Sequence, residues 1–394
     1  MEAVEGFDYI YMGSPYPISL KNGLLEKHAF VDFPADVLQH AILQGFCENG
    51  YQVRVLTSVR ISGYSGFFIK PFHYSHFNSE KKDDLYVGAI NFPIVNRLYT
   101  AFQLAKHLKK IVSREGKKKV MIYAVDSFSL FAVWLNRKRL SSVTLIVPDL
   151  PEFMSENDGL FYKIGKSIER RIVNALIHVV DKFVLLSPFM VEKLPIGNKP
   201  WIQMEGIFSE TGVEIKTVER KKIILYTGNL DKRYGILDLL NAFRRTRLPE
   251  YELYICGNGD TVEEIKSCAK NDCRVKYLGI LAHDEVLTLQ RNASLLVNPR
   301  HKAETYTKYS FPSKTIEYMA SGTPVLMSHL DSIPKEYEPY LFFFDDESVE
   351  GMSHRIQEIC ELPEEELNML GASASAFIRT FKNPSAQVYR IINM

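Results

Sequence analysis

Residues 222–245 read KIILYTGNLDKRYGILDLLNAFRR: an apolar run, a turn bounded by two glycines and an amphipathic helical pattern in direct succession. This order predicts a buried strand that leads straight into a helix. The pattern repeats downstream, with strands expected at 253–256, 275–278, 295–297 and 325–327, and helices at 236–245, 262–269, 284–292 and 313–321. Such alternation is typical of a parallel α/β sheet covered by helices.

The first half of the chain shows the same alternation. Apolar runs predict strands at 9–12, 53–56, 120–123, 144–147 and 183–186, and helical patterns separate them, for example at 35–48 before the Asn49-Gly50 stop signal. A chain of 394 residues with 46% hydrophobic content supplies enough apolar material for two cores. We therefore expect an α/β protein of two doubly wound, Rossmann-like domains with a cleft between them.

The polar stretch 207–221 lacks a clear period and is expected to connect the two domains, which gives residues 1–206 and 207–379. Asn383-Pro384 interrupts the helical pattern near the C-terminus, so a last helix at 385–392 is expected to bring residues 380–394 back to the first domain. In doubly wound sheets ligands gather beyond the carboxyl ends of the strands. The candidate site residues are therefore those directly after each strand.

The cysteine content and the lengths of the apolar runs indicate the cellular location of the protein. The five cysteines (Cys47, Cys256, Cys268, Cys273 and Cys360) are odd in number and free of CxxC spacing, which suggests neither a disulfide framework nor a zinc site. Met1 to Ile10 does not resemble a signal peptide, and no run approaches the roughly 18 apolar residues of a spanning helix. We expect a cytoplasmic protein, with any membrane contact peripheral at the inner face of the plasma membrane.

Charge is divided unevenly along the chain. Residues 1–205 hold 25 Lys and Arg against 20 Asp and Glu, a net +5, whereas the rest holds 23 against 27, a net −4. Basic clusters lie at 106–110, 117–119 and 137–139. They either attract anionic lipid headgroups or are solvated helix ends. No nucleic-acid partner is expected.

The clearest chemical signal is YSFPSKTIEYMASGTP at 309–324. Pro312 breaks the loop, and Ser313 is placed to cap a helix whose free N–H groups can receive a diphosphate. Lys314 adds positive charge there, and Glu317 lies one turn on, where a carboxylate can accept hydrogen bonds from two ribose hydroxyls. The alternative is an ordinary capped helix with Lys314 and Glu317 facing water.

This string resembles the donor-nucleotide motif of retaining family-4 glycosyltransferases, in the branch that reads Pro-Ser-Lys-x-x-Glu-Tyr-x-x-x-Gly-x-Pro. The resemblance extends over the second domain and implies the GT-B fold, with a nucleotide-diphosphate sugar as donor substrate and no cofactor. At the turn 226–235 many relatives carry an arginine directly after the first glycine, Gly228, and a lysine directly before the second. Here those positions are Asn229 and Tyr234. Lys232 or Arg233 is expected to grip the phosphates instead, or both are solvated loop charges.

Further candidates lie on the same donor side. Gly257-Asn258-Gly259 resembles the family's second donor loop, although any tight turn between strand and helix can need such glycines. Ile280 stands where relatives hold the nucleobase through backbone groups, and Arg300 is expected either to bind a phosphate or sugar hydroxyl or to form a structural salt bridge. The family's glutamate eight positions before Glu317 is absent, because that position is Tyr309. Glu304, Thr307, Lys308 and Tyr309 are the candidates for its role.

The first domain gives a thinner signal. Gly23 resembles the glycine-rich turn that brings backbone close to the donor, and a flexible surface turn explains it equally well. Asp149 follows the fourth strand candidate, where relatives often place a polar side chain against the transferred sugar; capping a helix or turn is its other use. Residues 60–77 interleave aromatic and basic side chains, which suits a lipid-linked saccharide or a hairpin that packs its rings inward: Tyr64, Phe67, Phe68, Lys70, Phe72, His73, Tyr74, His76 and Phe77.

The resemblance implies transfer with retention, by front-face displacement in which the departing phosphate helps to deprotonate the acceptor. Asp149, Lys314 and Arg233 are the expected catalytic side chains. No Asp-x-Asp occurs, in agreement with a reaction that needs no metal. Resemblance to polysaccharide-assembly enzymes of bacteria suggests a membrane-located, polyprenyl-diphosphate-linked acceptor. The alternatives are a soluble or protein acceptor, or a non-catalytic GT-B partner subunit; a dehydrogenase is disfavoured because no Gly-x-Gly-x-x-Gly follows the first strand.

Overall fold

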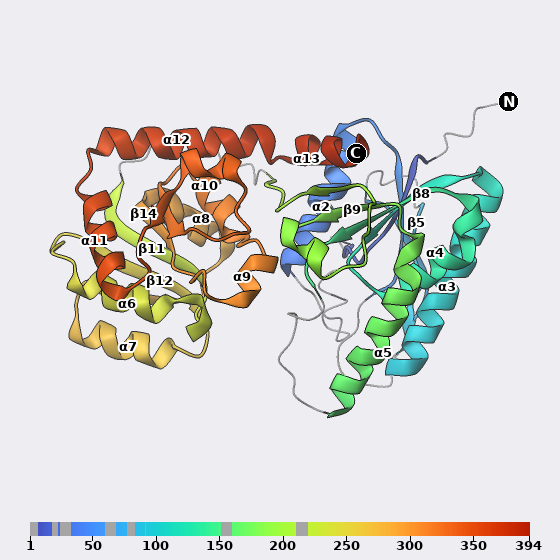
Figure 1. Cartoon of the computed structure of the whole chain (residues 1–394), viewed down its shortest axis with the longest axis horizontal. Coiled ribbons are helices and arrows are strands. Elements are labelled where there is room, and N and C mark those ends of the chain that lie inside the picture. The colour runs from blue at the N-terminus through green and yellow to red at the C-terminus, as the bar shows by residue number, and fades with distance from the viewer. Residues whose placement is uncertain are drawn as a thin grey trace. The chain divides into compact units, whose positions relative to one another are not determined.

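The computed structural model describes residues 7–17, 23, 33–59, 68–76, 83–90, 92–150, 160–209 and 220–394. The chain divides into two compact units, Met1–Ile207 together with Pro384–Met394, and Phe208–Asn383. Each unit has a sheet of mostly or entirely parallel strands with helices against it (Figure 1). Within the described ranges no helix is long and apolar enough to cross a membrane.

The first unit is built on an eight-stranded sheet, and the five predicted strands form its centre: β1 (Tyr9–Met12), β2 (Val53–Thr57), β7 (Lys118–Tyr123), β8 (Leu140–Val147) and β9 (Lys182–Leu185). Three shorter strands extend the sheet: β4 (Phe72–Tyr74), β5 (Asp84–Tyr86) and β10 (Trp201–Gln203). The order is β10-β9-β8-β7-β1-β2-β5-β4, parallel throughout except that β4 runs antiparallel to β5. A separate antiparallel pair joins β3 (Phe68–Ile69) to β6 (Ala89–Ile90).

Five helices are described in the first unit: α2 (Phe33–Glu48), α3 (Pro93–Glu115), α4 (Ser127–Asn136), α5 (Leu160–Leu176) and α13 (Pro384–Ile392). Helix α13 packs against α2, and Val388 and Ile391 join the core beside Phe46. The approach is close because α2 carries Gly45, where a Cβ would lie 2.3 Å from the carbonyl oxygen of Pro384. The predicted return of the C-terminal helix to the first unit is confirmed.

The second unit has a six-stranded, fully parallel sheet in the order β13-β12-β11-β14-β15-β16. Its strands are β11 (Lys221–Asn229), β12 (Glu252–Asn258), β13 (Val275–Gly279), β14 (Ala293–Asn298), β15 (Val325–Ser328) and β16 (Phe342–Phe344). Its helices are α6 (Ile236–Arg245), α7 (Val262–Asn271), α8 (His283–Asn292), α9 (Thr305–Tyr309), α10 (Lys314–Ala320), α11 (Val349–Cys360) and α12 (Glu364–Phe381). All five strands predicted here are present, and β16 is an addition.

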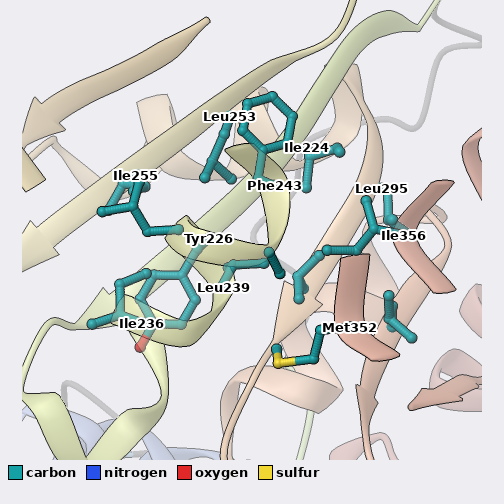
Figure 2. Close-up of a cluster of buried hydrophobic side chains, with 14 of the residues drawn as sticks. Ile224, Tyr226, Ile236, Leu239, Phe243, Leu253, Ile255, Leu295, Met352 and Ile356 are labelled. Carbon is teal, nitrogen blue, oxygen red and sulfur yellow. The ribbon is translucent and has the colours of Figure 1, made fainter. Parts of the chain in front are cut away.

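The packing of the second unit's core explains why its strands and helices could be predicted from the sequence. Figure 2 shows side chains of the β11, β12 and β14 strands packed against those of α6 and α11, including Ile224, Leu239, Phe243 and Ile356. All four are fully buried. Residues Ile236, Leu239, Leu240 and Phe243 follow the helical period, so one face of α6 covers the sheet. The sheet edge beyond the carboxyl ends of these strands remains free of this packing and carries the polar residues.

Candidate functional site

The loops after β11 and β12 run against each other, and two glycines permit the contact. A Cβ on Gly257, whose φ is +142°, would lie 1.8 Å from the carbonyl oxygen of Gly228. One on Gly259 would lie 2.3 Å from the carbonyl carbon of Leu230. The amide of Leu230 donates to the carbonyl of Asn258 at 2.9 Å. The glycines are therefore needed for the packing of these loops, and they bring the ends of two neighbouring strands together.

Two aspartates that the sequence did not single out fasten the same loops. Asp260 accepts a hydrogen bond from the amide of Lys232 at 2.8 Å, and Asp231 accepts one from the amide of Asp260 at 3.3 Å. The side chain of Asn229 accepts from the amide of Asp231 at 2.8 Å. Asn229 therefore shapes its own turn, and Lys232 lies exposed directly after that turn.

Beyond this turn, two arginines flank one tyrosine ring. The guanidinium carbon of Arg300 lies 4.7 Å from the ring centre of Tyr234, and that of Arg233 lies 5.0 Å from it. Arg233 is also 5.6 Å from the ring of Tyr306, which meets Tyr234 edge to face at 5.9 Å. A guanidinium over an aromatic face can still donate its in-plane N–H groups to oxyanions. Arg233 donates one of them, from Nη2, to the hydroxyl of Tyr234 at 3.2 Å. Tyr234, which stands where relatives carry lysine, thus organises two cations.

Burial and the positive charge of Arg300 have opposite effects on the pKa values of the tyrosines in this cluster. Burial raises the pKa of Tyr306 to about 12, although Arg300 acts in the opposite direction. Burial likewise raises the pKa of Tyr226, again opposed by Arg300. Among the described residues Arg300 makes no ion pair, so the salt-bridge interpretation finds no partner there. Its neighbour His301, which the sequence did not single out, lies 2.8 Å from Asp238 and 3.3 Å from Glu347.

The Lys314 and Glu317 pair occupies helix α10. Lys314 Nζ lies 2.8 Å from Glu317 Oε1, and the two side chains are 35% and 22% exposed, so neither simply faces water. The same Oε1 accepts a hydrogen bond of 2.6 Å from Gln290 of α8, whose side chain is fully buried. Gln290 Nε2 also lies 3.3 Å from the hydroxyl of Thr227, the residue before Gly228. A buried polar chain thus ties Glu317 to the end of β11.

Tyr318 completes this buried chain. Its hydroxyl accepts from the amide of Thr227 at 2.8 Å and donates to the carbonyl of the same residue at 3.0 Å. Burial raises the pKa of Tyr318 well above its usual range, so the phenol stays protonated and keeps donating. Neither Gln290 nor Thr227 was predicted, because a lone glutamine inside a helical pattern gives no local signal.

One local prediction was wrong. Ser313 adopts helical torsion angles, φ −51° and ψ −30°, and its side chain makes no capping hydrogen bond. The reason is that the amide of Thr315 already donates to the carbonyl of Pro312 at 2.8 Å. The proline therefore starts the helix through its backbone, and the exposed hydroxyl of Ser313 is not used for capping.

The remaining donor-side candidates lie at the end of β13 and in or next to α9. Ile280 is 77% exposed directly after Gly279 at the end of β13. Of the four candidates for the missing glutamate, Thr307 and Tyr309 are buried, whereas Glu304 is exposed and Lys308 lies 5.6 Å from the Tyr309 ring centre.

In the first unit, Asp149 is exposed just beyond β8, and Gly23 has open space around it. A strained residue that was not predicted, Ala124, follows β7 with φ +70°. Strain of this kind at a strand end is a recurrent feature of functional sites. The loop after β1 is held by α2, since Gln39 accepts from the amide of Ser14 at 2.7 Å and Asp36 from that of Tyr16 at 2.8 Å.

The described part of the aromatic segment, residues 68–76, forms strands rather than an open surface. Phe72 stacks on Tyr86 with ring centres 4.6 Å apart, and β4 pairs with β5. His76 lies 2.8 Å from Asp84, and both side chains are almost fully buried. The hairpin interpretation therefore holds over this range, while Tyr64, Phe67 and Phe77 lie outside the described residues.

Residues 210–376, which contain every donor-side element described above, match the family described as Glycosyl transferases group 1. These residues form a group 1 glycosyltransferase domain. The family is a retaining one, and the resemblance of the 309–324 string to family-4 enzymes is thereby confirmed.

Solved structures resemble the chain over its whole length. The sucrose-phosphate synthase of Thermosynechococcus elongatus is 15% identical, with 98% of each chain covered and a TM-score of 0.62. HepE of Anabaena, in complex with UDP, is 13% identical over 98% of this chain and 100% of its own, with a TM-score of 0.62. WaaG, a glycosyltransferase involved in lipopolysaccharide biosynthesis, is 13% identical over 98% and 100%, with a TM-score of 0.59. These likenesses show the GT-B fold; no curated protein sequence matches the chain.

Proposed function

We propose that the second unit binds a nucleoside diphosphate sugar at the carboxyl edge of its sheet and that the first unit binds the acceptor. The observation that carries the donor assignment is the pair of arginines, Arg233 and Arg300, whose guanidinium carbons lie 5.0 and 4.7 Å from the ring centre of Tyr234. Together with Lys314 they supply three cations on the edge where a diphosphate has to be held. HepE, which has the same fold, binds UDP and UDP-glucose, so uridine nucleotides are the first donors to test.

Within this proposal Glu317 binds the ribose. Its Oε1 is occupied by Gln290 and Lys314, whereas Oε2 has no hydrogen-bond partner among the described residues. A carboxylate with one oxygen fixed and the other free is suited to accept from vicinal hydroxyls. The diphosphate and the base contact backbone groups of the neighbouring loops, at Gly228, Asn229, Gly257, Asn258, Gly259 and Ile280. Lys232 supplies an exposed positive charge beside them.

The reaction we propose breaks the bond between the sugar's anomeric carbon and the terminal phosphate oxygen, and forms a bond from the same carbon to an acceptor hydroxyl on the same face. The hydroxyl proton passes to the departing phosphate, so no separate base is needed. Negative charge that grows on the diphosphate is stabilised by Arg233, Arg300 and Lys314. We expect these side chains to suffice without a metal, and activity is then unchanged in EDTA. Asp149 is our candidate for contact with the transferred sugar.

We propose a membrane-located, lipid-linked saccharide as the acceptor, with the reaction on the cytoplasmic face of the membrane. Two observations support it. The first unit carries the net positive charge of the chain, and WaaG, of the same fold, is involved in lipopolysaccharide biosynthesis. Polyprenyl diphosphate is the carrier we favour for such an acceptor. If transfer to soluble sugars proceeds equally well, the acceptor part of the proposal is wrong and the donor part stands.

A thermal-shift screen tests the donor site. UDP, GDP, ADP, CMP, dTDP and their sugar conjugates are compared, and a ligand at a hundredfold excess over Kd is expected to stabilise the protein by about 2.7 kcal/mol. Lys314→Ala and Glu317→Ala should abolish the shift. The matched control is the Glu263 and Lys266 pair of α7, which has the same spacing and the same 2.8 Å separation but lies outside the candidate site. Retention of the shift in both site variants, or its loss in the control, contradicts the assignment.

A further inference from the structure

Helix α3 presents an exposed stripe that changes from apolar to cationic along its length. Val95, Leu98 and Phe102 recur at helical spacing and are 51%, 57% and 59% exposed. Lys106 and Lys109, which are also exposed, continue the same stripe one and two turns further on. An exposed aromatic residue and two aliphatic residues in one row are unusual on a helix of a globular protein, whose apolar side normally faces the core.

The apolar surface continues from α3 onto α4. The ring of Phe102 meets that of Phe131 edge to face at 5.6 Å, and Phe131 lies 5.9 Å from the ring of Trp134. Trp134 and Leu135 are each 45% exposed. The three rings therefore form a connected row across two packed helices.

Helix α5 borders this row with a second apolar stripe. Ile164, Ile168 and Ile172 recur every four residues and are 48%, 53% and 41% exposed. Glu169 joins α5 to both neighbours, since it pairs with Arg97 of α3 at 2.8 Å and accepts from the amide of Ser127 of α4 at 3.1 Å. Figure 1 shows the three helices beside one another in the first unit. We call their exposed surface the α3–α5 face.

The net charges of α3 and α5 indicate which kind of partner the α3–α5 face can bind. Helix α3 carries five Lys and Arg residues against one Glu, a net +4, and α5 carries four against one, a net +3. Burial and the neighbouring lysines lower the pKa of His107, so this charge at neutral pH comes from the lysines and arginines. Two copies of the face would bring like charges together, which disfavours self-association. Apolar and aromatic side chains within a cationic rim fit acyl chains beneath anionic headgroups.

We propose that the α3–α5 face docks on an anionic lipid bilayer. Leu98, Phe102 and Trp134 enter the boundary between headgroups and acyl chains, and Lys106 and Lys109 contact the phosphates. The proposal goes beyond the donor chemistry, because neither a nucleotide nor an acceptor is needed for docking. It also differs from the earlier expectation for residues 60–77, whose described part is folded into strands.

Vesicle flotation of the full chain tests docking without any substrate. The wild type is expected to float with vesicles of phosphatidylcholine mixed with phosphatidylglycerol, to bind phosphatidylcholine alone much more weakly, and to lose binding as salt increases. Leu98→Gln/Phe102→Gln removes apolar contacts and Lys106→Gln/Lys109→Gln removes charge. Each double variant should weaken binding at least about tenfold. Met369→Gln/Phe381→Gln is the matched control, since these residues of α12 are 61% and 56% exposed.

The outcomes separate this inference from the proposed function. Because the substituted side chains are exposed, all three double variants should keep the melting temperature of the wild type and the nucleotide-induced shift. Absence of vesicle binding by the wild type, or equal loss in the α12 control, overturns the docking surface. Concentration-dependent association in sedimentation that Leu98→Gln/Phe102→Gln abolishes, without vesicle binding, would show that the face joins two copies instead. If no nucleotide raises the melting temperature of the wild type, the donor-site assignment is contradicted and the docking inference is unaffected.

Discussion

The carboxyl edge of the second sheet and the α3–α5 face of the first unit use polar and charged side chains in opposite ways. At the sheet edge they are engaged with one another: Gln290 holds Glu317, Tyr318 holds Thr227, and Asp231 and Asp260 hold neighbouring amides. On the α3–α5 face the lysines of α3 point to solvent beside exposed apolar side chains. The first arrangement presents a fixed set of groups, as recognition of a small ligand requires. The second suits a broad, fluid partner that needs no fixed geometry.

The substitution with the largest expected effect disrupts the close contact between the loops after β11 and β12. Gly257→Ala places a methyl group 1.8 Å from the carbonyl oxygen of Gly228 at a φ of +142°, and should destabilise the second unit by about 3 kcal/mol or more. Gly279→Ala is the control, because its φ of +70° is also positive but no atom lies within 4 Å of the added carbon. That variant should lose only about 1 kcal/mol.

The two tryptophans make this measurement specific to one unit. Trp134 and Trp201 both belong to the first unit, so tryptophan fluorescence reports its unfolding, whereas circular dichroism reports both. Gly257→Ala should shift an early transition in circular dichroism and leave the fluorescence transition in place. Equal losses for Gly257→Ala and Gly279→Ala would show that the two loops separate at little cost, and the edge would then not be rigid.

Much of this organisation was predictable where the information is local. The apolar runs fixed the strand positions because each central strand is buried, and the helical period of residues 236–245 fixed α6. The Pro-Ser-Lys-x-x-Glu string identified Lys314 and Glu317, which lie within one helical turn. The stripe at residues 95–109 is equally local, but its meaning depended on exposure, and a helical period alone does not say which side faces water.

What could not be predicted depends on contacts between distant segments. Gln290 and Glu317 are 27 positions apart, and nothing in the helical pattern around Gln290 marks it as a partner. The stacking of Arg300 on Tyr234 joins two loops that only the strand order β11-β14 makes neighbours. The capping prediction for Ser313 was wrong for a related reason, since the competing backbone hydrogen bond from Thr315 to Pro312 depends on the actual loop torsions.

The next effect concerns the stacked arginines. Arg300→Ala and Arg233→Ala should each lower turnover about 100-fold, because each removes a donor that stabilises charge on the departing diphosphate. Tyr234→Ala keeps both charges but removes the ring that orders them, and a smaller loss is expected. Arg355→Ala is the control, since that residue also lies over an aromatic ring, Phe342 at 5.7 Å, without belonging to the site. If all three arginine variants behave alike, the effect is one of net charge and not of placement.

The smallest expected effect tests most directly whether the Glu317 carboxylate is held in a fixed position. Gln290→Leu removes the hydrogen bond of 2.6 Å to Glu317 Oε1 while leaving Glu317 itself and its ion pair with Lys314 in place. If Gln290 positions the carboxylate for the ribose, the affinity for UDP should fall about tenfold and that for 2′-deoxy-UDP should change far less, because a single charge-assisted hydrogen bond is worth about 1.5 kcal/mol. The ratio of the two dissociation constants, measured by calorimetry, isolates this role, since general destabilisation would weaken both ligands equally. A variant that keeps the wild-type ratio would show that Gln290 only fills the core. A wild type that does not distinguish the two nucleotides would instead remove the ribose role from Glu317.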